Sequence, residues 1–287
     1  MYCSVTMIYS PTQTIAFMDC PASWWLRYHE GWVPRMLTKA DIAKMLGSSF
    51  HKAIAHWRAD PATSTPDNFA ANYAREALAK AIVAGHCFHR DAESPKDALP
   101  DRVANLVARF IKEDPIPPDW RLGNAELILP NHGNAIVDQA VSLPTDQPTV
   151  LDYKVKDKLE ARYYDKTVAE YAHTWQMMHY AWAYGEHIGQ PVTQYWICLV
   201  VASPTFSAKL HQYYIDPELM ELWVQSAQAV WRLMADIEAG AYYPWHNFHW
   251  HTRWGREPYA DAFLRHRLHD HLLEADYVKI GGRDGAT

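Results

Sequence analysis

Three charged side chains on two neighbouring predicted strands are the residues in this sequence best suited to chemistry. Asp138 lies in a predicted strand over 134–143, and Asp152 and Lys154 lie in the next one, over 149–155. Because side chains alternate along a strand, Asp152 and Lys154 point to the same face. Asp138 meets them if the two strands pair in the right register. Two carboxylates that close repel each other, and a divalent cation removes that repulsion.

Carboxylate oxygens are hard ligands that suit Mg²⁺ or Mn²⁺. An ammonium group beside them can orient an attacking water or neutralise the charge that develops on a phosphate. The group therefore predicts metal-dependent phosphodiester hydrolysis. The alternative is that Asp-x-Lys belongs to a solvated strand face. The flanking Val150, Leu151 and Val155 favour a buried strand instead, where a buried Asp and Lys need a reason.

Helices and strands that would position these residues follow from hydrophobic periodicity and turn signals. Helices are predicted over 39–57, 69–87 and 101–112, strands over 122–129, 134–143 and 149–155, a long helix over 162–187, strands over 194–201 and 209–215, and helices over 217–239 and around 259–277. This order predicts an α/β fold with one mixed central sheet flanked by helices. We expect a single domain over 1–287, in which helices over about 39–114 cover the site, 120–240 form the catalytic core and 241–287 form a C-terminal extension.

Composition limits the class of protein. A formal net charge of −6 argues against a generally basic nucleic-acid coat protein, but not against a nuclease whose basic contacts are confined to one groove. No apolar run approaches the roughly 20 residues that span a bilayer, so no membrane is expected as a partner. Cysteines at 3, 20, 87 and 198 form no CxxC pair and no disulfide framework. The absence of a signal-peptide pattern adds to the expectation of a cytoplasmic protein.

Five short motifs, in order along residues 9–215, resemble those of RecB-type nucleases in the PD-(D/E)XK superfamily. They are an N-terminal segment from Tyr9 to Pro21, Gly47–His51 on a helix, Ala135–Asp138 and Leu151–Lys154 on strands, and Gln176–Tyr180 on a helix. That branch includes CRISPR adaptation exonucleases, helicase-nuclease subunits and phage relatives. Ala135 stands where the family has glycine. No single motif is specific, but their common order is, and it implies a restriction-endonuclease-like core with a helical N-terminal insertion.

The resemblance also implies a metal site for Mg²⁺ or Mn²⁺. Asp138 and Asp152 would be its main carboxylate ligands, His51 would reach it from the covering helix, and the backbone carbonyl of Tyr153 would complete it. Read alone, His51 would be an ordinary core or surface histidine.

The same resemblance makes Lys154 the catalytic lysine. Gln176 and Tyr180 would orient Lys154 or the scissile phosphate. Glu126, on the first predicted strand, is a possible additional acid near the metal, and a surface glutamate with an ionic partner is an equal alternative.

Many relatives hold an iron–sulfur cluster on the cysteine of the N-terminal segment and three C-terminal cysteines. Cys20 is present, but no cysteine follows Cys198, so no iron–sulfur cluster is expected. The corresponding region contains His246, His249 and His251, which could bind a metal such as zinc. Aromatic packing in place of the cluster is the favoured interpretation.

DNA, single-stranded or with duplex ends, is the expected partner. Lys156, Lys158, Arg162 and Lys166 follow the motif and can contact the phosphate backbone. The equal alternative is a solvated helix start, because acidic residues lie between them. The resemblance favours an exonuclease. The competing hypothesis is a non-cleaving nucleic-acid-binding or assembly subunit, with a partner protein in a recombination or CRISPR adaptation complex. An unrelated hydrolase is disfavoured, since the chain has no nucleophile elbow, Walker loop or HExxH motif.

Overall fold

The computed structural model describes residues 8–61, 66–203, 205–242, 244, 251–252, 255–256 and 277–280. Residues 259–276 of the helix predicted around 259–277 lie outside the described residues, and Tyr277 begins a short strand. The possible zinc ligands His246 and His249 also lie outside them, and so does the side chain of His251. Within the described residues, no helix has the length and apolar character needed to cross a membrane.

A mixed sheet of five strands forms the centre of the described structure, in the order β4-β5-β6-β7-β8. Its strands are β4 (Arg121–Leu129), β5 (Ala135–Ser142), β6 (Pro148–Lys158), β7 (Gln194–Ser203) and β8 (Ser207–Tyr214). β6 and β7 run parallel, and the other neighbours run antiparallel. The predicted α/β class with a mixed sheet flanked by helices is confirmed, and β6 and β7 extend beyond their predicted ends.

One face of the sheet is covered by a helical layer. Its helices are α3 (Lys39–Ala59), α4 (Pro66–Val83), α5 (Arg90–Asp97) and α6 (Leu99–Lys112). The apolar stripes of α3 and α6, which include Phe50 and Phe110, pack on Leu151 and Tyr153 of β6. α4 begins and ends earlier than the helix predicted over 69–87. Gly85 adopts φ +84°, and the chain leaves the helix before Cys87.

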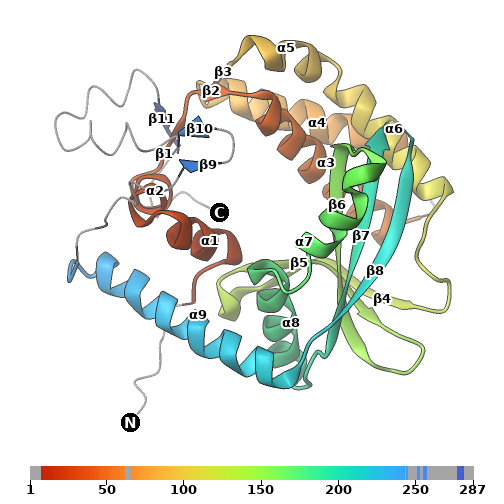
Figure 1. Ribbon diagram of the computed structural model, residues 1–287. Helices are drawn as coiled ribbons and strands as arrows, with labels where there is room; N and C mark the ends of the chain where they lie inside the picture. The colour runs from red at the N-terminus through yellow and green to blue at the C-terminus, as the bar shows by residue number, and fades with distance from the viewer. Residues whose placement is uncertain are drawn as a thin grey trace.

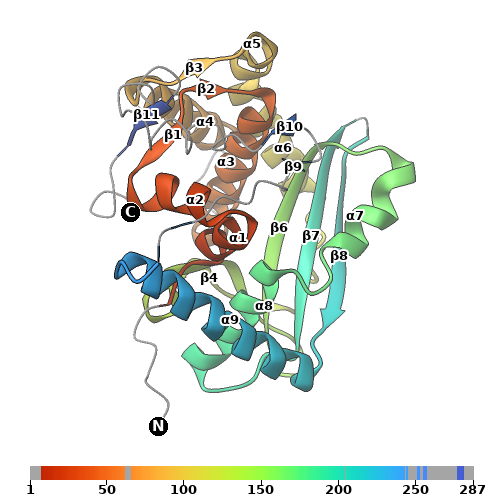
Figure 2. The same cartoon turned by 60° about the vertical axis from the view of Figure 1, so that its left-hand side comes forward.

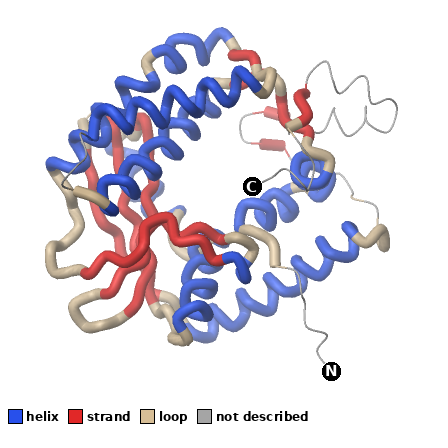
Figure 3. Tube along the Cα trace, turned by 180° about the vertical axis from the view of Figure 1, so that it is seen from behind, coloured by secondary structure: helices blue, strands red, loops and turns tan. Residues whose placement is uncertain are grey.

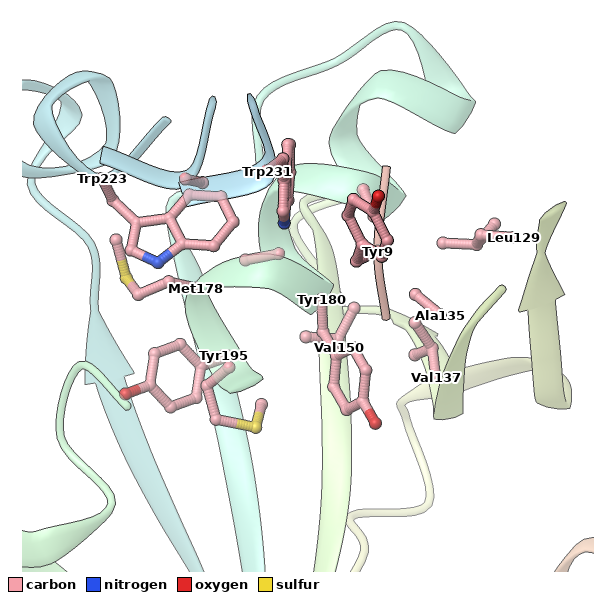
Figure 4. Close-up of a cluster of buried hydrophobic side chains, with 14 of the residues drawn as sticks. Tyr9, Leu129, Ala135, Val137, Val150, Met178, Tyr180, Tyr195, Trp223 and Trp231 are labelled. Carbon is pink, nitrogen blue, oxygen red and sulfur yellow. The ribbon is translucent and has the colours of Figure 1, made fainter. Parts of the chain in front are cut away.

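The opposite face packs against helices from both ends of the chain. They are α1 (Pro11–Asp19), α2 (Pro21–Trp24), α8 (Trp175–Ile188) and α9 (Pro217–Glu238). Figure 4 shows the core that joins them to the sheet, with Trp223 and Trp231 of α9 beside Met178 of α8, and Val150 of β6 beside Tyr180. Asp216 caps α9, since its side chain accepts a hydrogen bond from the Glu218 amide at 2.8 Å.

The elements are arranged as a ring in projection. In Figure 1 the sheet lies on the right, the layer from α3 to α6 above, α9 below, and α1 and α2 opposite the sheet; Figure 3 shows the same arrangement from behind. A π-helix (Trp25–His29) continues α2. Two short pairings link distant segments: β1 (Trp32–Pro34) with β11 (Tyr277–Lys279), and β2 (Met36–Leu37) with β3 (Cys87–Phe88). β9 (His251–Thr252) pairs with β10 (Gly255–Arg256), its neighbour in the sequence.

The single long helix predicted over 162–187 is wrong. A 3-10 turn (Ala161–Tyr163) and α7 (Tyr164–Glu170) precede α8, and the chain breaks between them at His173, whose φ is +54°. The Thr174 side chain caps α8 by accepting from the Met177 amide at 3.4 Å. The buried hydroxyl of Tyr195 fixes the break, because it accepts from the His173 amide and donates to the Tyr171 carbonyl. Figure 2 shows α7 and α8 as separate helices beside the sheet.

Candidate active site

A fork between β5 and β6 forms the centre of the candidate site. The two strands pair from Ser142 and Pro148 as far as Gln139 and Leu151, and there the described ladder ends. Beyond this pair, the backbone amide of Tyr153, two residues after Leu151, donates to Asp138 Oδ2 at 2.9 Å. A side-chain carboxylate thus takes the hydrogen bond that a strand carbonyl would accept, and Asp138 is fixed against β6.

His51 reaches this fork from α3. Its Nδ1 lies 3.2 Å from Asp138 Oδ1, and its ring packs edge-on against Tyr153, with 6.2 Å between centroids. Burial alone would lower the pKa of His51, but the Asp138 carboxylate outweighs it and raises that pKa above its usual value. For Asp138, burial alone would raise the pKa, but the imidazole and the Tyr153 amide together hold it below the usual value. The carboxyl group of Asp138 is therefore held both ionised and in a fixed position.

Asp152 and Lys154 form an ion pair on one face of β6, as the strand alternation predicts. Lys154 Nζ lies 2.8 Å from Asp152 Oδ2, and the Asp152 side chain is only 2% exposed. Burial raises the pKa of Asp152 to about 6, against the opposing effect of Lys154. Despite the ion pair, Asp152 Oδ2 accepts no well-aligned hydrogen bond from any described residue. A buried carboxylate oxygen with spare acceptor capacity is suited to an additional cation.

A chain of hydrogen bonds from α8 holds the lysine. Lys154 Nζ donates to Gln176 Oε1 at 2.9 Å, and Gln176 Nε2 donates to the Tyr180 hydroxyl at 2.8 Å. Gln176 and Tyr180 are four residues apart and so share a helix face. Burial raises the pKa of Tyr180 well above its usual value, so its hydroxyl stays neutral and can donate. Four residues from two elements thus form one connected network.

The donor set suits a hard divalent cation in kind. Asp138 and Asp152 offer carboxylate oxygens, and His51 lies against the first of them. Within the described residues, no three His, Cys, Asp or Glu side chains are already arranged as a metal site. His51 is engaged with Asp138, and Lys154 with Asp152, so the two side chains balance the carboxylate charges that a cation would otherwise neutralise.

Glu126 lies apart from this network. It sits on β4 between the residues that pair with Gln139 and Val137, and its backbone has a φ of +47°. Its side chain lines a neighbouring hollow with Lys52, His56 and Tyr73 rather than contacting either aspartate through a described hydrogen bond or ion pair.

The residues predicted to bind phosphate follow Lys154 along β6 and in the segment after it. Lys156 shares the Lys154 face of β6, and its Nζ lies 5.8 Å from the ring centroid of Tyr171. Arg162 packs on Tyr163 and pairs with Glu160 at 2.8 Å. Lys158 and Lys166 are exposed at the end of β6 and on α7.

Sequence reasoning missed two residues near the lysine. Lys209 of β8 lies in the same cross-strand row as Lys154, because both pair with Leu199 of β7. Tyr171 lies close enough to Asp152 for that charge to raise its pKa, after the larger effect of burial. Only the strand register shows that Lys209 lies in this row, and only the break before α8 shows that Tyr171 lies close to Asp152.

A crystal structure from Eubacterium rectale, described as a "putative exonuclease", matches 86% of this chain and 88% of its own with a TM-score of 0.40 and 10% sequence identity. At that level the likeness informs neither substrate nor mechanism. No curated protein matches the chain. The sequence model of the PD-(D/E)XK nuclease superfamily matches residues 8–250, which is most of the chain. With that match, and with two strand aspartates and a lysine brought together at a fork in the sheet, the chain belongs to the PD-(D/E)XK nuclease superfamily.

Proposed function

We propose that this chain is a Mg²⁺- or Mn²⁺-dependent deoxyribonuclease of the RecB-type branch, acting as an exonuclease on phosphodiester bonds. The observation that carries the proposal is the position of Lys154. Its ammonium is fixed between Asp152 Oδ2 and Gln176 Oε1, at 2.8 and 2.9 Å, beside a second carboxylate. A lysine held on two sides has its remaining donor directed, which suits contact with a reacting phosphate.

In this proposal, Asp138, Asp152 and the Tyr153 carbonyl would hold the cation, with His51 beside Asp138. The cation supplies Lewis acidity to the phosphate and the attacking water. Lys154 donates to the phosphate oxygen on which charge develops, or orients the water. Gln176 keeps the ammonium in place, and Tyr180 keeps the Gln176 amide in place. His51 and the Tyr153 amide keep Asp138 ionised.

The DNA strand would follow the Lys154 face of the sheet. Lys156 on Tyr171 and Lys209 on Tyr164 pair a cation with an aromatic ring, with Nζ 5.8 and 5.4 Å from the ring centroids. Such pairs offer a charge to the phosphates and a flat surface to unpaired bases. Lys158, Arg162 and Lys166 would continue this track. The helices over 39–114 would cover the site from the other side, and 120–240 would be the catalytic core, with 241–287 as an extension.

Digestion of end-labelled DNA tests the proposal. Single- and double-stranded DNA labelled at the 5′ or the 3′ end is incubated with Mn²⁺, Mg²⁺ or EDTA. Wild type should release label only with metal, and the end lost first gives the polarity. Lys154→Ala should lose cleavage but still bind DNA. Lys44→Ala, an exposed lysine on α3, is the matched control and should cleave normally.

Two outcomes would overturn the proposal. Full metal-dependent cleavage by Lys154→Ala would remove the lysine from the mechanism. Tight DNA binding by wild type without cleavage under any metal would favour a non-cleaving assembly subunit.

A further inference from the structure

A hollow of about 520 Å³ lies next to the candidate site, between α3, α4 and β4. Its volume lies in the range of small-ligand sites. Its lining combines a cation, two aromatic rings, two carboxylates and two small apolar side chains: Lys52, His56, Tyr73, Asp60, Glu126, Ala55 and Ala59. None of these residues belongs to the network around Lys154.

The hollow shares α3 with the candidate site, and its strand β4 pairs with β5, which carries Asp138. Lys52 directly follows His51 on α3. Glu126 stands across from Asp138, since its neighbours Ala125 and Leu127 pair with Gln139 and Val137. A nucleic-acid strand with one phosphate at Asp138 would therefore place an adjoining nucleotide at this hollow.

Aromatic rings along the wall are held in fixed orientations while remaining accessible. The imidazole of His56 stacks on Phe69, with 4.4 Å between centroids and 4° between planes. Its Nδ1 lies 3.1 Å from the Tyr73 hydroxyl. A ring that is ordered by its neighbours loses little conformational freedom when a base stacks on it. Phe69 and Tyr73 are partly buried and pack against the core of the helical layer, while His56 is exposed, so the rings form a rigid platform at the surface.

Glu126 occupies a left-handed backbone conformation that glycine adopts readily and glutamate rarely. Its φ of +47° lies inside a strand, after a register shift between Leu122 and Ala125. Such conformations persist where the surrounding structure fixes them, and they gather at functional positions. No hydrogen bond or ion pair joins Glu126 or Lys52 to another residue in the part of the chain that the structure describes. Both groups are thus available to a ligand.

We propose that this hollow binds the nucleotide adjoining the scissile phosphate and prefers a base with an exocyclic amine. Lys52, at the end nearest His51, contacts the nucleotide phosphate. The base stacks against His56 and Tyr73. The Glu126 carboxylate accepts a hydrogen bond from the amine, as carboxylates do from cytosine N4, whereas thymine presents a carbonyl and a methyl group there. This inference rests on the proposed nuclease function, because it assumes a strand at Asp138.

A titration followed by NMR tests the hollow without any cleavage. Protein with ¹³C-labelled alanine methyl groups is titrated in EDTA with dCMP, dTMP and deoxyribose 5-phosphate. The signals of Ala55 and Ala59 should shift with dCMP, more weakly with dTMP and least with the sugar phosphate. Ala53 and Ala181 are buried elsewhere and should not move, which also reports that each variant is folded.

Variants separate the three contacts. Lys52→Ala should weaken every ligand, His56→Ala should weaken the nucleotides but not the sugar phosphate, and Glu126→Gln should remove the preference of dCMP over dTMP. Lys39→Ala, thirteen residues upstream on the same helix, should bind like wild type.

The results distinguish a failure of nucleotide binding in the hollow from a failure of DNA cleavage at the candidate site. If wild type cleaves DNA but Ala55 and Ala59 do not shift up to the solubility limit of dCMP, the hollow is not a nucleotide site. Equal shifts with all three ligands, or an unchanged preference in Glu126→Gln, would overturn the base contact. A wild type that binds dCMP at Ala55 and Ala59 but never cleaves DNA would instead refute the nuclease.

Discussion

The Nζ of Lys154 donates to the side-chain oxygen of Gln176 at 2.9 Å, so a residue from α8 sets the position of the lysine on β6. The lysine side chain is 21% exposed, and without this bond it could rotate away from Asp152 toward solvent. Gln176 therefore positions the lysine, and Lys154 is the group that would contact the phosphate.

Gln176→Ala is expected to lower DNA cleavage by about 10- to 100-fold, the effect typical of residues that orient a catalytic group. Tyr180→Phe breaks only the second bond of the chain and should lower it less. DNA binding in EDTA should be unchanged in both variants, which filter binding measures beside single-turnover cleavage. A loss of binding equal to the loss of cleavage would place Gln176 in DNA contact instead.

Part of this site could be predicted from the sequence because its geometry is local. Alternation along a strand places Asp152 and Lys154 on one face, and a spacing of four places Gln176 and Tyr180 on one helix face. The hairpin order of β4, β5 and β6 also follows from local turn signals, as the structure confirms.

Features set by tertiary packing could not be predicted. The break before α8 depends on the hydroxyl of Tyr195, a residue 22 positions from His173. The place of Glu126 depends on a register shift and a positive φ, which no pattern of residue types reveals. The packing of three tryptophans around His179 could not be predicted either.

Binding of a cation should be visible in thermal stability, independently of activity. At about 100 times the dissociation constant, a ligand adds roughly 2.7 kcal/mol, so Mn²⁺ should raise the Tm of wild type by about 5 °C. Asp152→Asn removes a buried carboxylate and should abolish that shift. Asp165→Asn, exposed on α7, is the matched control and should keep it. A full shift in Asp152→Asn, measured by differential scanning fluorimetry, would place the cation elsewhere.

His179 should make the fold sensitive to mild acid. Its side chain is fully buried, Nε2 bonds the His132 carbonyl at 3.1 Å, and burial lowers its pKa to about 4. An unfolded histidine titrates near 6.5, so between that pH and about 4 the unfolded state binds more protons. The stabilising contribution is therefore complete above 6.5 and is lost as the pH falls.

Between pH 7 and pH 5, the free energy of unfolding should decrease by about 2 kcal/mol through His179. Urea denaturation of wild type and His179→Phe at both values measures this difference. The variant cannot titrate at this position, so its decrease should be smaller by that amount. Equal decreases in the two proteins would mean that the imidazole is already protonated in the fold.

Two glycines with the same backbone conformation should respond differently to alanine. Gly133 and Gly189 have φ values of +69° and +68°. An added Cβ at Gly189 meets nothing within 4 Å, but at Gly133 it would lie 2.5 Å from the backbone carbon of Tyr9. Gly189→Ala should cost about 1–2 kcal/mol, the cost of the left-handed conformation, and Gly133→Ala clearly more. Equal losses in chemical denaturation would mean that the Tyr9 segment yields freely.

Stability measurements at position 126 test whether the β-bulge imposes the positive φ of Glu126. In an ordinary strand, glycine is less stable than alanine by about 0.5–1 kcal/mol. At φ +47° the order should reverse, because alanine keeps the penalty of about 1–2 kcal/mol that glycine escapes. Glu126→Gly should therefore be more stable than Glu126→Ala in urea denaturation, while neither variant should favour dCMP over dTMP. If Glu126→Ala is the more stable, the strand has relaxed to an ordinary conformation, and the strain is a property of the glutamate rather than of the bulge that carries it.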